Sequence, residues 1–283
     1  MRWRSREETL IGKALVWLVL LGGASLFIFP LFWTVMTALK SYQEASRYPP
    51  VWIPDPPQWG NFVEAWTTLP QPFHVFVLNT YVISALATLG TVVSCSLVAY
   101  GFARFRFRGR TALFLILLST MMLPAQVTMI PVFVFWSKLG LVDTFVPLVL
   151  PAWFGINAFA VFLLRQFYMT LPKELDEAAM IDGCSHFGIW WRIIMPLSRP
   201  ALITVAILTF LGGWNNFLGP LIYLNSLEKY TVSIALNMFR DQFYVRLELL
   251  MAASLIHIVP VIIIFFAAQR YFIKGIAMTG LKQ

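Results

Sequence analysis

Residues 74–103 read HVFVLNTYVISALATLGTVVSCSLVAYGFA and include no aspartate, glutamate, lysine or arginine. An ionised side chain near the centre of a bilayer costs roughly 2.5 kcal/mol or more, so charge-free sequence of this length is typical of lipid surroundings. Because about 20 residues of α-helix cross the hydrocarbon core, this run is long enough to span it. Charge-free sequence begins at Ala65, but Pro70 and Pro72 precede the run, and we therefore expect the helix to begin near His74.

Five further charge-free runs have the length of a transmembrane helix. They are Ala14–Leu39, Thr111–Ser137, Thr144–Leu164, Pro200–Leu227 and Leu249–Gln269. The run Ala65–Ala103, which contains residues 74–103, is the sixth. We predict an all-α integral membrane protein with six transmembrane helices. Several runs contain proline, and neighbouring helices of a membrane bundle can satisfy the backbone groups that proline leaves free, so we expect several kinks.

The composition agrees with a lipid environment. Of the 283 residues, 59% are hydrophobic and only 12% are charged, whereas soluble domains carry about 25% charged residues. In a soluble chain the net charge of +8 would indicate a nucleic-acid-binding protein, but here the basic residues flank the apolar runs instead of forming one face. We therefore expect membrane lipid, and no nucleic acid, among the partners.

The distribution of lysine and arginine predicts the orientation, because cytoplasmic loops are enriched in both. Most of the 21 fall in segments that the six helices place on one side, namely residues 1–13, 104–110, 165–199 and 270–283. The opposite side holds only Lys40, Arg47, Lys138, Lys229, Arg240 and Arg246. We expect both termini in the cytoplasm, and we interpret the basic turn Arg104–Arg110 as a topology anchor at anionic headgroups.

This topology divides the chain into four parts. They are the cytoplasmic N-terminus with the first helix (residues 1–39), an external loop (40–73), a five-helix core (74–273) and a cytoplasmic tail (274–283). The external loop is dense in proline, so we expect it to be rigid and mostly without regular helix or sheet. Its tryptophans suit an interfacial belt or a docking surface for an external partner.

The connection between the fourth and fifth helices is the most informative one. Residues 171–196 read LPKELDEAAMIDGCSHFGIWWRIIMP, which is too polar to span a membrane. Pro172 followed by clustered acidic residues is typical of a helix N-terminus, where negative charge meets the positive end of the helix dipole. Gly183 suits a left-handed C-terminal cap, Ser185 the N-cap of a second helix, and Pro196 its end. We predict two short helices along the membrane surface.

The same segment resembles a known family. Glu177-Ala178-Ala179, then Gly183, then Ile193-x-Met195-Pro196 are similar in type and spacing to the Glu-Ala-Ala…Gly…Ile-x-Leu-Pro loop of permease subunits of binding-protein-dependent ABC importers. Met195 stands where the family has leucine, which conserves volume and polarity. The stretches WGNFVEAW (59–66), GWNNF (213–217) and QRYFIKGIAMTGL (269–281) resemble the carbohydrate-uptake branch, so the resemblance covers nearly the whole chain.

The resemblance implies that residues 165–199 dock on an ATPase, and we call them the coupling loop. The implied contact residues are Glu177, Ala178, Ala179, Asp182, Gly183, Ile193, Met195 and Pro196. It also implies a heterodimer with a second permease, two cytoplasmic ATPase subunits and an external solute-binding protein at a prokaryotic inner membrane. The solute would be a sugar or a relative such as glycerol phosphate or a polyol.

ATP hydrolysis is assigned to the partners. The sequence has no Gly-x-x-x-x-Gly-Lys-Ser/Thr phosphate loop, so this chain cannot hydrolyse ATP alone. ATP and magnesium would be bound by the ATPase subunits, and we expect no cofactor in this chain.

Polar side chains inside the apolar runs are candidates for the solute pathway, because such groups are costly where they face lipid. They are Asn157 in the fourth run, Trp214, Asn215 and Asn216 in the fifth, and His257 in the sixth. Amides suit the hydroxyl groups of a sugar, and an aromatic face suits the C–H groups of its ring. The alternative is that the amides and the histidine join one helix to another by hydrogen bonds.

A secondary transporter and a membrane enzyme are the two alternatives to an importer permease. A secondary transporter would normally carry buried carboxylates and often an inverted repeat, and the predicted helices show neither. A membrane enzyme would need a cluster of catalytic or metal-ligating residues. His74, His186 and His257 are scattered, and Cys95 and Cys184 have no metal-ligand spacing, so we expect no catalytic residue and no metal site.

Overall fold

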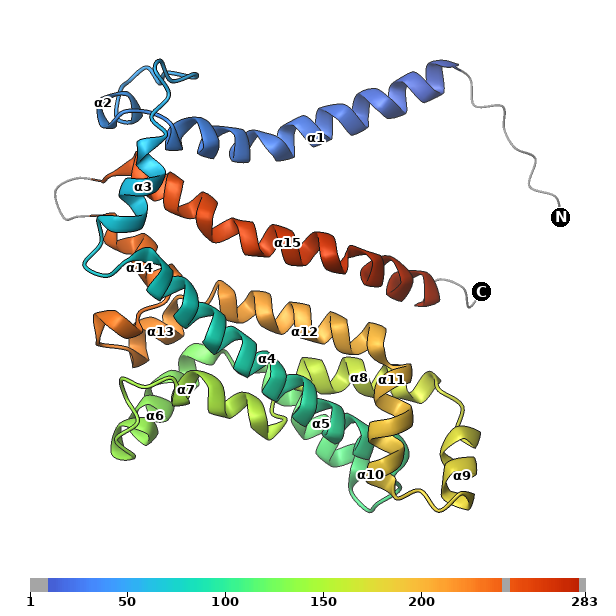
Figure 1. Cartoon of the computed structure of the whole chain (residues 1–283). Helices are drawn as coiled ribbons and strands as arrows, with labels where there is room; N and C mark the ends of the chain where they lie inside the picture. The colour runs from blue at the N-terminus through green and yellow to red at the C-terminus, as the bar shows by residue number, and fades with distance from the viewer. Residues whose placement is uncertain (1–9, 241–244, 280–283) are drawn as a thin grey trace. The chain divides into compact units, whose positions relative to one another are not determined.

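The computed structural model describes residues 10–240 and 245–279, which are built from helices (Figure 1). The longer helices are α1 (Leu10–Ala38), α4 (Phe73–Arg104), α5 (Arg110–Ser119), α6 (Ala125–Lys138), α8 (Ala158–Thr170), α12 (Arg199–Trp214) and α15 (Leu247–Thr279). The shorter segments are α2 (Tyr42–Ala45), α3 (Gly60–Thr67), η1 (Thr120–Met122), α7 (Val146–Val149), η2 (Leu150–Phe154), α9 (Glu174–Ile181), α10 (His186–Ile189), η3 (Trp190–Ile194), α11 (Met195–Leu197), α13 (Leu218–Tyr223), η4 (Leu227–Lys229) and α14 (Val232–Met238).

The predicted all-α membrane architecture is confirmed. Among the described residues, four helical segments are long and apolar enough to cross a membrane: Gly12–Ala38, Phe73–Arg104, Val146–Thr170 and Leu247–Ala267. Two bent helix pairs, one from Arg110 to Lys138 and one from His186 to Trp214, raise the number of spans to six if each pair counts as one. The second helix begins at Phe73, one residue before the predicted start, and the last continues to Thr279, beyond its predicted end.

The predicted third span, Thr111–Ser137, is bent at a proline, as expected, and is formed by two helices, α5 and α6. α5 passes through the 3₁₀ turn η1 to Leu123, and the segments on either side of the break differ in direction by 100°. Pro124 is extended and has no backbone N–H, so the helical hydrogen bonds cannot continue across it. Leu123 is extended as well, as a residue before proline favours.

The predicted fifth span, Pro200–Leu227, is interrupted, because α12 ends at Trp214 and α13 begins only at Leu218. The Asn215 side chain donates to the carbonyl of Leu211 (2.9 Å), and the Asn216 side-chain oxygen accepts from the N–H of Gly219 (3.2 Å). The Leu211 carbonyl keeps its helical bond from the Asn215 N–H as well. The Asn216 side chain, however, takes the N–H of Gly219 that a continuous helix would pair with the Asn215 carbonyl, and this local competition favours a helix end.

The chain divides into two compact units, and the first comprises Met1–Thr68 with Met238–Ile256. The part of the predicted external loop that belongs to this unit, residues 40–68, folds onto the end of α1. The Asn61 side chain donates to the carbonyls of Ala38 and Lys40, both at 2.8 Å. These bonds satisfy carbonyls that have no partner inside the helix. The loop predicted to be rigid therefore contains two short helices and is fastened to a helix end.

One arginine joins three helices of this first unit. The Nη2 atom of Arg246 lies 2.8 Å from the Glu64 carboxylate in α3, and its Nε contacts Glu248 in the first turn of α15. Its guanidinium also lies over the ring of Tyr42 in α2. Because Glu248 is only 1% exposed, this partner neutralises a carboxylate that would otherwise be buried as an unpaired charge.

The second unit comprises Leu69–Asn237 with His257–Gln283, and α4 is its central helix. α8 and α12 both pack against α4. The approach to α12 is close at Gly213, where a Cβ would lie only 3.0 Å from the Ser84 hydroxyl oxygen. Buried residues from α4, α8, α12 and the coupling loop form one apolar cluster, which includes Cys95, Tyr100, Leu164, Ile189 and Val205.

The two ends of α4 are bonded to different loops; α4 is labelled in Figure 1. At the C-terminal end, Arg104 donates to the carbonyl of Leu171 in the coupling loop (3.2 Å). At the N-terminal end, the Asn79 side chain donates to the carbonyls of Glu228 and Tyr230 (2.7 and 3.0 Å). Loops predicted to be cytoplasmic and loops predicted to be external therefore lie at opposite ends of one helix, as the predicted topology requires.

Asp143 fixes the loops at this N-terminal end. Its carboxylate accepts from the Lys229 ammonium (2.8 Å), from the Ser226 hydroxyl and from the backbone N–H groups of Asn225 and Ser226. These donors, with Lys229 the strongest, hold the pKa of Asp143 well below its usual range. Asp143 lies in one connection that is predicted to be external, and Lys229 lies in another. Their ion pair joins these two connections to each other.

Candidate coupling and pathway sites

The first helix of the coupling loop, α9, begins close to its predicted start. Glu174, Asp176 and Glu177 occupy its first turn, where negative charge is favoured by the helix dipole. Leu171 ends α8 in an extended conformation directly before Pro172, which disfavours the helical conformation for the residue that precedes it. The proline therefore separates α8 from α9.

Two cap residues fix the turn between the loop helices. Gly183 has φ +80, and its N–H donates to the carbonyl of Met180 (3.0 Å). The Ser185 hydroxyl accepts from the N–H of Gly188 (3.2 Å) and so caps the second helix. Both predicted caps are confirmed. The second helical stretch runs from His186 through a π-helical turn to Leu197, one residue beyond Pro196.

The implied contact residues of the coupling loop divide between two faces. The exposed ones are Glu177, Ala178, Asp182, Gly183 and Pro196, whereas Ala179 is buried and Ile193 and Met195 are partly buried against the core of the subunit. Of the two alanines expected to approach a partner, only Ala178 therefore faces outward. Leu175, Met180 and Ile181 are 39%, 45% and 87% exposed, so α9 presents apolar side chains together with Glu177.

Sequence reasoning missed the role of Arg104. The basic turn that contains Arg104 is typical of a topology anchor. The Arg104 guanidinium nevertheless points inward and contacts the carboxylate of Asp176 in α9. Burial raises the pKa of the Asp176 carboxyl, and the neighbouring guanidinium opposes that rise. No local signal separates Arg104 from the other arginines of the basic turn, because its partner lies far along the chain.

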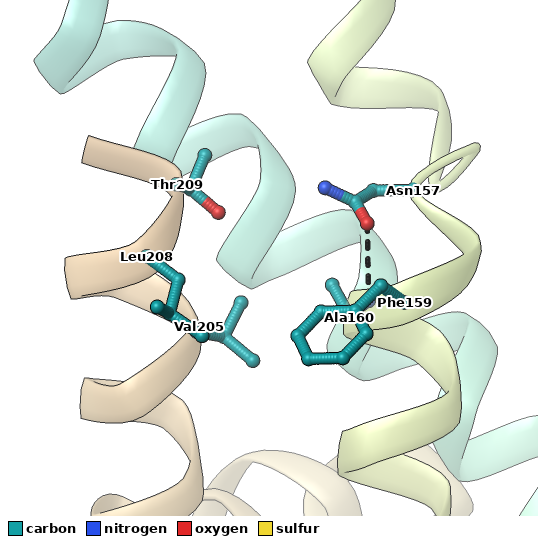
Figure 2. Close-up of a pocket in the computed structure, with 6 residues that line it drawn as sticks. All are labelled: Asn157, Phe159, Ala160, Val205, Leu208 and Thr209. Atoms are coloured by element: carbon teal, nitrogen blue, oxygen red, sulfur yellow. Dashed lines mark hydrogen bonds between the residues drawn. The ribbon is translucent and has the colours of Figure 1, made fainter. Parts of the chain in front are cut away.

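A cavity of about 180 Å³ opens between α8 and α12 (Figure 2). Its lining residues are Asn157, Phe159 and Ala160 from the start of α8, and Val205, Leu208 and Thr209 from α12. The helical structure is interrupted between η2 and α8, and Asn157 is the N-cap of α8. The side-chain oxygen of Asn157 accepts a hydrogen bond from the N–H of Ala160 (3.0 Å). The amide nitrogen of Asn157 points across the cavity toward the Thr209 side chain.

These groups suit a neutral solute with hydroxyl groups. With its oxygen engaged in the cap, Asn157 offers N–H donors to the cavity, and the Thr209 hydroxyl can donate or accept. The Phe159 ring adds an aromatic surface, and every lining residue is uncharged. Thr209 was not singled out from the sequence, since a lone threonine in an apolar run also bonds readily to its own helix.

Three of the predicted pathway residues form a second group. The Trp214 indole N–H donates to the carbonyl of His257 (3.2 Å), and the two rings stack with centroids 5.4 Å apart. Nε2 of His257 lies 3.4 Å from the side-chain oxygen of Asn215. Trp214 is 1% exposed and packs inside the subunit, whereas Asn215 and Asn216 are exposed at the end of α12. Asn215 is thus the member best placed to meet a solute.

Replacing Asn215 by alanine should lower solute uptake by about two- to tenfold, the effect of losing one hydrogen bond of roughly 0.5–1.5 kcal/mol. Complex assembly should not change, because the amide donates within its own helix. Asn237→Ala is the matched control, since the Asn237 side chain also donates to a carbonyl four residues earlier, that of Ser233, on the exposed face of α14. Uptake is measured in cells; an unaffected Asn215→Ala variant would reduce Asn215 to helix packing.

Comparison with known proteins gives one family for most of the chain. The profile described as "Binding-protein-dependent transport system inner membrane component" matches residues 92–278. The chain is 33% identical to the probable ABC transporter permease protein YurM of Bacillus subtilis, covering 99% of this chain and 92% of that protein. It is 36% identical to the arabinooligosaccharides transport system permease protein AraQ of Halalkalibacterium halodurans, covering 95% and 97%. With the sn-glycerol-3-phosphate transport system permease protein UgpE of Yersinia pestis it shares 31% identity, covering 92% and 94%.

A solved structure shares the architecture. The fold matches a chain in the crystal structure of a bacterial ABC transporter involved in the import of the acidic polysaccharide alginate, with a TM-score of 0.80 and 25% sequence identity. The match covers 96% of this chain and all of the other. The bent pairs and the coupling loop therefore occur within a fold that a transporter of this class adopts.

Proposed function

The chain belongs to the family of inner membrane components of binding-protein-dependent transport systems, and from this we propose that it forms half of the translocation pathway of a sugar importer. In such an importer the permease is the non-catalytic membrane subunit. The observation that carries the proposal is the coupling loop, whose first helix exposes Glu177 beside Met180 and Ile181. An amphipathic helix face of this kind fits a groove on a partner protein.

The proposed assembly contains this chain, a second and different permease, two cytoplasmic ATPase subunits and an external solute-binding protein. ATP and magnesium are bound by the ATPase subunits. Closure of the ATPase pair moves the coupling loops of both permeases and changes the side of the membrane to which the pathway opens. This chain therefore contributes half of a two-state pathway.

The proposed solute is a neutral sugar. The cavity between α8 and α12 combines an amide donor, a hydroxyl and an aromatic ring without a charged residue. A phosphate group would normally be met by arginine or lysine, and the residues that line this cavity include neither. Relatives for arabinooligosaccharides and for glycerol phosphate share the scaffold. The uncharged lining favours a sugar over glycerol phosphate for this half of the pathway.

Co-purification tests the assembly. A tagged copy of this chain, expressed with its neighbouring transport genes and examined by native mass spectrometry, should give a complex of one copy of this chain, one other permease and two ATPase subunits. A complex with two copies of this chain would contradict the heterodimer, and a stable monomer without ATPase would contradict the coupling assignment.

Reporter fusions test the proposed sidedness, in which both termini and the coupling loop are cytoplasmic. A reporter inserted in the basic turn 104–110 or fused at the C-terminus should report the cytoplasm, and one inserted at residues 49–57 should report the outside, because lysine and arginine are concentrated on the first side. The N-terminal arginines and Lys282 lie outside the described residues, so the reporters supply what the structure leaves untested. An external C-terminus would reverse the topology.

A further inference from the structure

Arg104 is the last residue of α4, and its side chain is only 5% exposed. Its Nε lies 2.8 Å from Oδ2 of Asp176 in the first turn of α9, whose side chain is 12% exposed. Arg106 and Arg108, in the same basic turn, are exposed. The ion pair is therefore largely shielded from water, where the attraction between charges is stronger than at a solvated surface.

The same guanidinium holds the chain that leads into α9. Its Nη1 donates to the carbonyl of Leu171 (3.2 Å), and its Nη2 donates to the carbonyl of Pro172 (3.5 Å). One planar guanidinium group therefore contacts both the approach to α9 and its first turn. A rotation or shift of α9 against α4 that exceeds the reach of this side chain breaks at least one of these contacts.

A second contact lies beside the first. The ring of Phe105, which follows Arg104, meets the ring of His186 at the start of α10 edge to face, with centroids 4.9 Å apart. The Phe105 ring also meets the ring of Tyr100 in α4, with centroids 5.4 Å apart. The end of α4 therefore contacts both helices of the coupling loop, the first through charge and the second through an aromatic pair.

We propose that Arg104 is the positioning residue through which movement of α9 is passed to α4. The inference rests on the proposed function, in which ATPase subunits move the coupling loop. α4 packs against α8 and α12, and the cavity is lined by residues of these two helices. A displacement of α4 by α9 therefore acts on the helices that line the pathway.

Stability alone does not account for this ion pair. Replacing a buried ion pair by apolar side chains of similar volume is often neutral or stabilising, because two charges need not then be removed from water. An apolar pair has no preferred direction, however, and can slide. The ion pair and its two carbonyl contacts fix the position of α9 on α4, and this property separates a positioning role from a structural one.

The test uses the reconstituted complex with its ATPase subunits and binding protein. Arg104→Met should reduce the stimulation of ATP hydrolysis by the solute-loaded binding protein by about fivefold or more, the lower end of coupling between sites. The ATPase should still co-purify, because Glu177 and Ala178 remain on the outer face of α9. Arg106→Met and Arg108→Met are the matched controls and should leave the stimulation unchanged.

The double variant Arg104→Met/Asp176→Leu separates positioning from stability. It should assemble and melt like the wild type, because no charge is left buried alone, yet its stimulation should stay as low as that of Arg104→Met. Restored stimulation in the double variant, full stimulation in Arg104→Met, or failure of the double variant to assemble would overturn the proposal. Absence of stimulation in the wild-type complex would instead contradict the proposed function.

Discussion

Replacing Glu177 by lysine should release the ATPase subunits from the purified complex. Glu177 is exposed on α9 next to the apolar side chains of Met180 and Ile181, which follow it by three and four residues. Our proposal gives it a basic partner on the ATPase, and lysine would place two positive charges together at a contact from which water is excluded. Loss of one member of a buried, hydrogen-bonded charge pair already weakens binding by about thirtyfold or more, and reversal of the charge adds repulsion.

A graded series makes this test specific. Glu177→Gln should weaken ATPase binding less than Glu177→Lys does, because it removes the attraction without adding repulsion. Glu174→Lys is the matched control, since Glu174 is also exposed in the first turn of α9 and the change alters the net charge equally and the helix-dipole interaction in the same direction. Binding is measured by pull-down of the ATPase. Equal losses for Glu174→Lys and Glu177→Lys would mean that charge in general, and no specific contact at Glu177, holds the ATPase.

Replacing Gly183 by valine should abolish the stimulation of ATP hydrolysis while the subunit still inserts in the membrane. Gly183 has φ +80, where an L-residue costs about 1–2 kcal/mol, and most for a β-branched side chain. A Cβ at Gly183 would meet no atom within 4 Å, so the cost is one of backbone conformation and not of space. The strained turn would relax by changing the direction of α10 relative to α9.

Gly183→Asn distinguishes backbone conformation from side-chain bulk. Asparagine adopts the left-handed conformation more readily than other non-glycine residues, so this variant should keep most of the stimulation although it too adds a side chain to the turn. The measurement is hydrolysis with and without the loaded binding protein in reconstituted complexes. Similar losses in both variants would point to a direct contact at Gly183, and full activity in Gly183→Val would remove this turn from the coupling mechanism.

The features that the sequence predicts correctly are those that depend on near neighbours. The left-handed conformation of Gly183, the N-cap at Ser185 and the acidic first turn of α9 depend on residues within one helical turn of each other, and all are found. The start of α4 follows in the same way, from the prolines before it and the charge-free run after it.

Long-range features could not be predicted in this way. Arg104 and Asp176 are 72 positions apart in the printed sequence, and no pattern near Arg104 shows that it turns inward. The bend at Pro124 and the end of α12 at Trp214 occur inside runs whose hydropathy is continuous, so run length alone predicts one helix where the structure has two. The cavity could not be predicted for the same reason. Its lining includes Asn157 and Thr209, which come together only through the packing of neighbouring helices.

Uptake into sealed vesicles tests the central claim most directly. The complete complex is reconstituted with the binding protein and a labelled sugar on one side and ATP with magnesium on the side of the ATPase subunits. The account predicts that labelled sugar accumulates only when both the binding protein and hydrolysable ATP are present, and that Glu177→Lys prevents this accumulation. Accumulation without nucleotide, driven by a proton or sodium gradient, would contradict it.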